Sequence, residues 1–161
     1  AAWVAKAAER TSPMKLVQLG PWEFSVPEGW AAKENDGQDY LESRDGAVGC
    51  YVKAVELAVA KETAEAVARS VQGIHESAFR KATKENWRIV ARTGMVSGAL
   101  FKSHLDMFDA ESKYRVLSLV LASTADACQV TIHNYDCGDY LANRDAYLST
   151  EQSMRRARQV V

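Results

Sequence analysis

His104 and Asp106 are the residues whose types and spacing come closest to a catalytic pair. They lie two apart in a segment whose apolar residues alternate, so both side chains would point to one face of a β-strand. A carboxylate in that position can orient an imidazole for general base catalysis. A hydrolase would also need a nucleophile or an activated water, and Ser97, between Val96 and Gly98, lacks the G-x-S-x-G context of a nucleophile elbow. Polar residues on a solvated strand are the favoured interpretation, and no catalytic residue is assigned.

The segment 134–148 is rich in side chains suited to binding. It contains Asn134, Tyr135, Asp136, Asp139, Tyr140, Asn143, Asp145 and Tyr147. Oxygen ligands of this kind suit calcium, but the spacing does not match a calcium loop, and turn chemistry explains the Asn and Asp residues better. Tyrosines grouped in a polar loop are typical anchors of protein interfaces, although they would equally pin the loop to the domain. We predict a partner-binding surface made of Tyr135, Asp136, Asp139, Tyr140 and Tyr147, with Asp36 and Asp39 from a second turn-rich segment at 33–46.

The histidines and cysteines form no recognisable metal site. Neither His75 nor His133 has a second histidine or a carboxylate two or four residues away, and the three cysteines match no zinc spacing. Cys50 and Cys128 are expected to be small buried hydrophobes. A bridge from Cys128 to Cys137 is conceivable in an exported chain, although the intervening strand would have to fold back within nine residues. The sequence predicts no metal and no cofactor.

Charge and hydropathy argue against two classes of partner. Lys and Arg total 20 against 21 Asp and Glu, so no basic surface of the kind that binds nucleic acid is indicated. No apolar run reaches the roughly 18 residues of a membrane-spanning helix. The chain begins with Ala1, which fits a trimmed chain or cleavage after a signal peptide, and a periplasmic or exported location is slightly favoured over a cytoplasmic one.

The early strands of a sheet are readable in the sequence. A length of 161 residues suits one domain with a packed core, here 14–161 after an N-terminal extension or short helix at 1–13. The alternation predicts strands at 14–19, at 22–27, between the turns Asp36-Gly37 and Asp45-Gly46, and at 47–57. The segment PWEFSVPEGW, residues 21–30, places three apolar side chains on one face and stops at Pro27, which lacks a donor for the ladder.

Residues 61–84 predict the strongest helix, with Thr63 able to cap its start. Its expected apolar stripe is Ala64, Val67, Ala68, Val71, Ile74, Ala78 and Phe79. Gly73 inside a helix costs about 1 kcal/mol relative to alanine, which suggests close packing there.

From Trp87 to Tyr135 the apolar period becomes two and predicts four antiparallel strands, divided at Thr93-Gly94, at 109–111 and at 123–126. The third, residues 114–122, is apolar at nearly every position and suits the sheet centre, buried on both faces.

A second helix is expected at the end of the chain. Ser149 and Gln152 have capping-box spacing, which predicts a helix over about 150–161 that packs through Met154, Ala157 and Val161. The predicted fold class is α+β: an antiparallel sheet of about six or more strands, with the helices at about 61–84 and 150–161 packed on it.

The element order and the residues Phe24, Val26, Pro27, Gly29 and Trp30 resemble the PsbP-like α/β/α sandwich family. That family includes the extrinsic oxygen-evolving protein of photosystem II, the Mog-type Ran-binding factor, and small bacterial proteins such as chaperones that load effectors into type VI secretion machines. The resemblance implies a binding protein or accessory factor more than an enzyme. Because this chain differs from those chaperones in its N-terminus and in the insert at 33–46, no partner-contacting residue is carried over.

We therefore predict a non-enzymatic module that binds another protein, as a bacterial immunity protein or a chaperone for a toxin or effector does. Two alternatives remain open: a small hydrolase using His104 and Asp106, and an exported accessory domain that binds a small ligand between sheet and helix. A homo-oligomer is also compatible with the sequence.

Overall fold

The computed structural model describes residues 13–35, 37–83, 86–137 and 140–157, which form ten strands and two helices. The strands are β1 (Met14–Leu19), β2 (Trp22–Pro27), β3 (Ala31–Asn35), β4 (Gln38–Glu42), β5 (Val48–Glu56), β6 (Arg88–Ser97), β7 (Leu100–Asp109), β8 (Tyr114–Ala122), β9 (Asp126–Asn134) and β10 (Arg155–Arg156). The helices are α2 (Ala64–Ala82) and α3 (Tyr140–Ser153). Neither described helix is long and apolar enough to cross a membrane.

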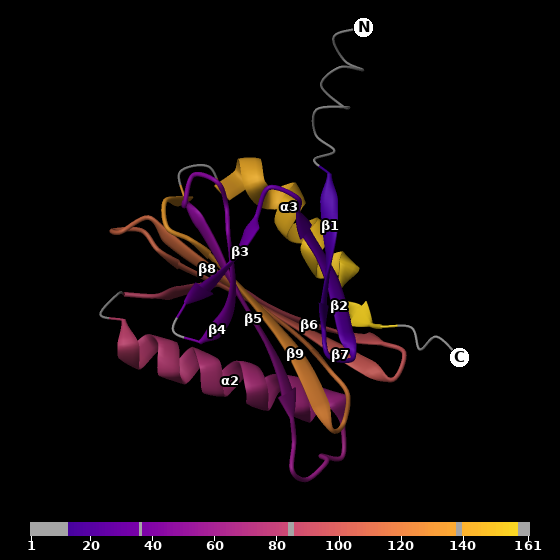
Figure 1. The fold of residues 1–161 in the computed structure, drawn as a ribbon. Coiled ribbons are helices and arrows are strands. Elements are labelled where there is room, and N and C mark those ends of the chain that lie inside the picture. The colour runs from indigo at the N-terminus through magenta and orange to yellow at the C-terminus, as the bar shows by residue number, and fades with distance from the viewer. Residues whose placement is uncertain (1–12, 36, 84–85, 138–139, 158–161) are drawn as a thin grey trace, which may run out of the picture.

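Seven strands form one antiparallel sheet in the order β3-β4-β5-β9-β8-β7-β6, and the other three form a small sheet in the order β1-β2-β10. Figure 1 shows α2 on one face of the large sheet, with α3 and the small sheet on the other. Strands β6 and β3 are therefore the two edges of the large sheet. The expected α+β class is confirmed, with more strands than the sequence predicted.

β8 is covered on both faces, as its nearly continuous apolar sequence predicted. Val116 and Val120 face α2, whereas Leu117, Leu119 and Leu121 face the small sheet and α3. The central position in the sheet belongs to its neighbour β9, with β8 next to it. A strand as apolar as β8 must be covered on both faces. Here α2 covers one face, and α3 with the small sheet covers the other.

The PWEFSVPEGW segment forms β2 and faces the large sheet. Trp22, Phe24 and Val26 are at most 1% exposed and join the main core, together with Tyr147 and Met154 from the α3 region. Strand β2 ends at Pro27 as expected.

The Thr63 cap is confirmed, because its side chain accepts a hydrogen bond from Ala66 N at 3.1 Å. The predicted apolar stripe is wrong at Ile74 and Ala78, and the expected close packing at Gly73 is wrong as well. Ile74 is 70% exposed and Ala78 is also exposed, because the covered face of α2 runs through Val67, Ala68, Val71 and Gln72 to the partly buried His75 and Phe79. Nothing lies within 4 Å of a Cβ built on Gly73, so this glycine makes no close packing contact.

The second helix lies earlier than predicted. Residues 149–152 form the last turns of α3 instead of the first turn of a helix at 150–161, and the predicted loop 136–148 is helical from Tyr140. The Ser153 side chain donates to the Thr150 carbonyl and accepts from Ser25 N at 2.7 Å, which holds the helix end against β2. The spacing of a capping box is a local pattern that also occurs in helix interiors.

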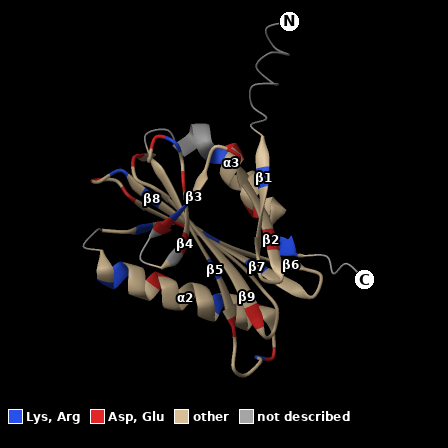
Figure 2. Ribbon diagram, viewed as in Figure 1, with Lys and Arg blue, Asp and Glu red and all other residues tan. Residues whose placement is uncertain are grey.

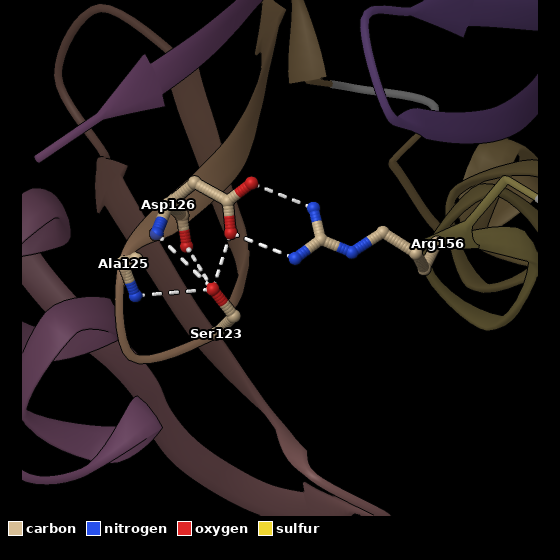
Figure 3. Close-up of polar contacts among 4 residues, drawn as sticks. All are labelled: Ser123, Ala125, Asp126 and Arg156. Atoms are coloured by element: carbon tan, nitrogen blue, oxygen red, sulfur yellow. Dashed lines mark hydrogen bonds and ion pairs between the residues drawn. The ribbon is translucent and has the colours of Figure 1, made fainter. Parts of the chain in front are cut away.

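After α3 the chain continues as the short strand β10, in which Arg155 and Arg156 pair with Glu23 and Trp22 of β2. The Arg156 guanidinium donates to both Asp126 oxygens, at 2.6 and 2.8 Å, and lies 4.1 Å from the centroid of the Trp22 ring. Figure 3 shows this fork together with the Ser123 hydroxyl, which donates to the same carboxylate. The Arg156 fork is the main reason that the pKa of Asp126 is lowered. The contact ties the small sheet to the β8–β9 turn.

The division between β6 and β7 is also misplaced in the sequence prediction. The turn lies at Gly98, with φ of +62°, and Gly94 lies within β6. A Cβ on Gly94 would lie 2.5 Å from the Phe101 ring. The glycine therefore leaves room for the Phe101 side chain of β7 to pack over β6.

Candidate functional site

Strand β6 is the most unusual surface feature of the described residues. All of its ten residues are exposed except Ala91, which is partly covered. The large apolar side chains are Ile89, Val90, Met95 and Val96, with exposed fractions of 40, 44, 60 and 71%. A long apolar edge strand is a template for pairing with another chain, and proteins normally protect such edges.

The opposite edge of the same sheet has that protection. β3 is five residues long and carries Lys33 and Glu34, and Lys33 lies 3.6 Å from Glu42. Short charged edges discourage strand addition. The two edges of one sheet therefore differ in length and in chemistry, and β6 is the open one.

The strand register determines which way the β6 side chains point. Val96 and Arg92 are opposite Phe101 and Leu105 of β7, which lie under α2. Met95 is opposite Lys102, on the face of α3. Apolar side chains are thus exposed on both faces of the strand, and a bulge between Ile89 and Ala91 separates the Ile89 end from the rest.

Basic residues line this edge. Arg92 donates to Glu76 of α2 at 2.7 Å, and Arg80 lies 3.8 Å from the same carboxylate, so two arginines share one acidic group. Arg88 lies over the Phe108 ring at 5.9 Å. Figure 2 shows the acidic and basic residues distributed along α2. The flank formed by β6 and the adjacent side of α2 therefore carries net positive charge, although the whole chain has a formal net charge of −1.

The predicted partner-binding residues do not form one surface. Tyr135 is 38% exposed on the α2 face, whereas Tyr147 is 3% exposed in the core on the opposite face, with its hydroxyl accepting from Asn134 Nδ2 at 3.3 Å. For Tyr147 the pinning role is the one observed. Asp136 is exposed just after β9, and Asp39 lies on the groove described below.

Three further residues of that prediction are only partly testable. Asp36 and Asp139 lie outside the described residues, and for Tyr140 only its place at the start of α3 is described. Whether any of the seven residues contacts a partner stays a prediction.

A cluster of aromatic rings and histidines lies on the α2 face of the sheet. The His133 ring packs edge-on against Tyr51 and Tyr114, and its Nδ1 is 2.7 Å from the Tyr114 hydroxyl. Burial, with a smaller effect of His75, lowers the pKa of His133 to about 4. His133 is therefore neutral near pH 7. This cluster is not visible in the sequence, because its members come together only through the register of β5, β8 and β9.

Two tyrosine hydroxyls meet over Gly49 at the edge of this cluster. The hydroxyls of Tyr40 and Tyr135 are 3.5 Å apart, and a Cβ on Gly49 would meet both of them, the Tyr135 oxygen at 2.6 Å. Burial raises the pKa of Tyr40, and the hydrogen bond with Tyr135 adds to this. The glycine is therefore needed for the close approach of two phenols.

The candidate catalytic pair has separate partners. His104 Nδ1 lies 2.5 Å from Glu151 Oε2, and Asp106 accepts from Arg115 Nε at 3.1 Å. Lys102 Nζ donates to the Glu151 carbonyl at 2.5 Å, and burial lowers the pKa of Lys102. His104 and Lys102 thus hold the end of α3 to β7, which is a structural use of the polar face.

The cysteines are free thiols. Cys50 and Cys128 are buried, as predicted, and burial raises the pKa of Cys128 to about 12. The conceivable bridge to Cys137 does not form, because β9 runs extended between the two residues. Among the described residues, no group of three His, Cys, Asp or Glu side chains could hold a metal ion.

A groove of about 540 Å³ lies between the small sheet and the β3-β4 end of the large sheet. Val17, Leu19, Leu41 and Val52 supply its apolar lining, and Asp39 is at its polar side. The groove lies between the two sheets, whereas the predicted alternative of a small-ligand site places that site between sheet and helix.

Comparison with known proteins adds information on the fold alone. No family model matches the chain, and no curated protein is detectably similar to it in sequence. The solution structure of cyanobacterial PsbP (CyanoP) from Synechocystis sp. PCC 6803 is similar, with a TM-score of 0.68 and 10% identity over 91% of this chain and 94% of that one. The expected PsbP-like fold is confirmed. The likeness to Mog-type proteins and secretion chaperones stays a prediction.

Proposed function

We propose that this protein is a non-enzymatic module that binds another protein, and that it acts as an immunity protein, chaperone or accessory factor for a bacterial toxin or secreted effector. The observation that carries the proposal is the exposed apolar edge strand β6. Stable protein interfaces bury apolar side chains at their centre, and β6 offers four of them on a rigid sheet.

The alternative use of the polar residues has less support. His104 and Asp106, the pair that a hydrolase would need, are each engaged by another side chain. A dyad with Glu151 in place of Asp106 would still lack a nucleophile within reach among the contacts that the structure describes. Replacing His104 by alanine should leave the function intact, and loss of function together with retained folding would restore the hydrolase hypothesis.

The test is binding to the product of the adjacent gene. The purified chain should bind that protein at micromolar concentration in isothermal titration calorimetry, with a negative heat-capacity change from apolar burial. The absence of binding to any protein encoded next to it would refute the proposal.

A further inference from the structure

We infer that β6 is the site where the partner binds, and that it receives an extended, acidic segment of the partner as an added strand. This inference rests on the proposed function and specifies its mode of binding. Strand addition supplies affinity through main-chain hydrogen bonds and specificity through the flanking side chains.

The backbone geometry fits strand addition. β6 pairs with β7 along one side from Arg88 to Ser97, and among the described residues no other element pairs with it. In an antiparallel ladder, alternate residues of an edge strand direct their N–H and C=O groups outward. Ten residues span about 33 Å, which is longer than a typical strand. The bulge between Ile89 and Ala91 breaks the regular register, so the regular part available to an added strand runs from Ala91 to Ser97.

The side chains define the kind of strand that fits. Met95 on one face and Val96 on the other are the most exposed apolar residues of β6, and Arg92 lies on the face of Val96. An added strand that alternates apolar and acidic residues can place its apolar side chains beside Met95 and its acidic ones on the Arg92 face. The charged residues of β6 are Arg88 and Arg92, and Arg92 shares Glu76 with Arg80. An incoming strand with acidic residues would supply the missing negative charge.

A second copy of this chain is a poorer occupant on the same grounds. An antiparallel pair of β6 strands would bring the arginines of both copies into one small interface, and β6 has no acidic residue to pair with them. The charge pattern therefore favours a different chain with acidic residues.

The experiment uses a fluorescein-labelled ten-residue peptide of alternating valine and glutamate, and a matched peptide with lysine in place of glutamate. Fluorescence anisotropy should show saturable binding of the acidic peptide and at least tenfold weaker binding of the basic one. NMR amide exchange should show slower exchange within 91–97 when the acidic peptide is bound. Equal binding of both peptides, or unchanged exchange in β6, would overturn the inference.

Two variants locate the site. Met95→Glu places a negative charge on an exposed position of β6 and should weaken binding of the acidic peptide at least tenfold, because it repels the glutamates and removes an apolar contact. Val59→Glu changes a residue that is 79% exposed outside any strand and should bind like the unmodified chain. Circular dichroism checks that both fold. Unaltered binding by Met95→Glu would contradict the assignment.

The outcome is separable from that of the proposed function. If the protein from the adjacent gene binds the unmodified chain and Met95→Glu equally well, the function stands and the β6 site is wrong. If the acidic peptide binds β6 and no protein from an adjacent gene binds, the site stands and the immunity or chaperone role is wrong. A dimer in sedimentation that Met95→Glu abolishes would instead identify the occupant as a second copy.

Discussion

The buried imidazole of His133 should make the protein lose stability as the pH falls from 7 toward 4. Burial lowers the pKa of His133 from 6.5 to about 4, so the folded state prefers the neutral ring more than the unfolded chain does. This contribution is fully present above pH 6.5 and is lost as the pH falls through the unfolded value toward the folded one. Linkage over that interval gives a loss of about 2.5 kcal/mol between pH 7.5 and pH 4.5.

Groups around His133 do not reverse this sign. The pKa of the neighbouring His75 is also lowered by burial and, less strongly, by Lys53, so His75 acts in the same direction. Tyr51 and Tyr114 are uncharged throughout this pH range. Asp126, whose pKa is lowered from its usual 3.8, loses most of its contribution below pH 4.5, so it adds little to the change over this interval.

The assay is urea unfolding followed by tryptophan fluorescence at pH 7.5 and 4.5. His133→Gln removes the titrating ring and keeps a polar group for the Tyr114 hydroxyl. The free energy of unfolding of this variant should therefore fall by about 2.5 kcal/mol less over this interval than that of the unmodified chain. Tyr114→Phe leaves the titrating imidazole of His133 in place, so this variant should keep most of the pH dependence of the free energy of unfolding. If His133→Gln and the unmodified chain lose the same free energy, the account of this cluster is wrong.

Two packing predictions concern the other contacts. Gly49→Ala should lower the free energy of unfolding by about 1–3 kcal/mol, because the added Cβ would displace the Tyr40 and Tyr135 hydroxyls, and an unchanged midpoint in urea unfolding would contradict this. Arg156→Ala should cost about 1 kcal/mol, since the Asp126 fork is partly exposed, and should speed amide exchange in β2 at the β10 pairing. Unaltered exchange there would show that this fork does not hold the C-terminal strand.

The features that the sequence predicted well depend on local chemistry. The alternation of Trp22, Phe24 and Val26 and the stop at Pro27 correctly describe β2, and Thr63 caps α2 as expected. Each depends on residues a few positions apart, so distant contacts did not alter the outcome.

The errors arise where distant contacts decide. Gly94 marks a turn by composition, but the Phe101 ring packs across it and the strand continues. Ser149 and Gln152 have cap spacing, but they lie at the end of a helix that begins at Tyr140. A local sequence pattern shows neither the packing of a ring from another strand nor whether a capping spacing lies at the start or the end of a helix.

The β6 site was missed for a related reason. The adjacent apolar pairs, Ile89 with Val90 and Met95 with Val96, depart from the alternation of a half-buried strand, and that departure was the available signal. Their exposure follows from the position of β6 at the sheet edge, and the order of strands in a sheet is a property of the whole chain.

Hydrogen–deuterium exchange of the chain in complex with the protein from its adjacent gene tests the central claim most directly. We predict that binding slows exchange in β6, residues 88–97, and leaves the segment 134–137 and the groove residues of β1 unchanged. Slower exchange in 134–137 or β1, with β6 unaffected, would contradict the account.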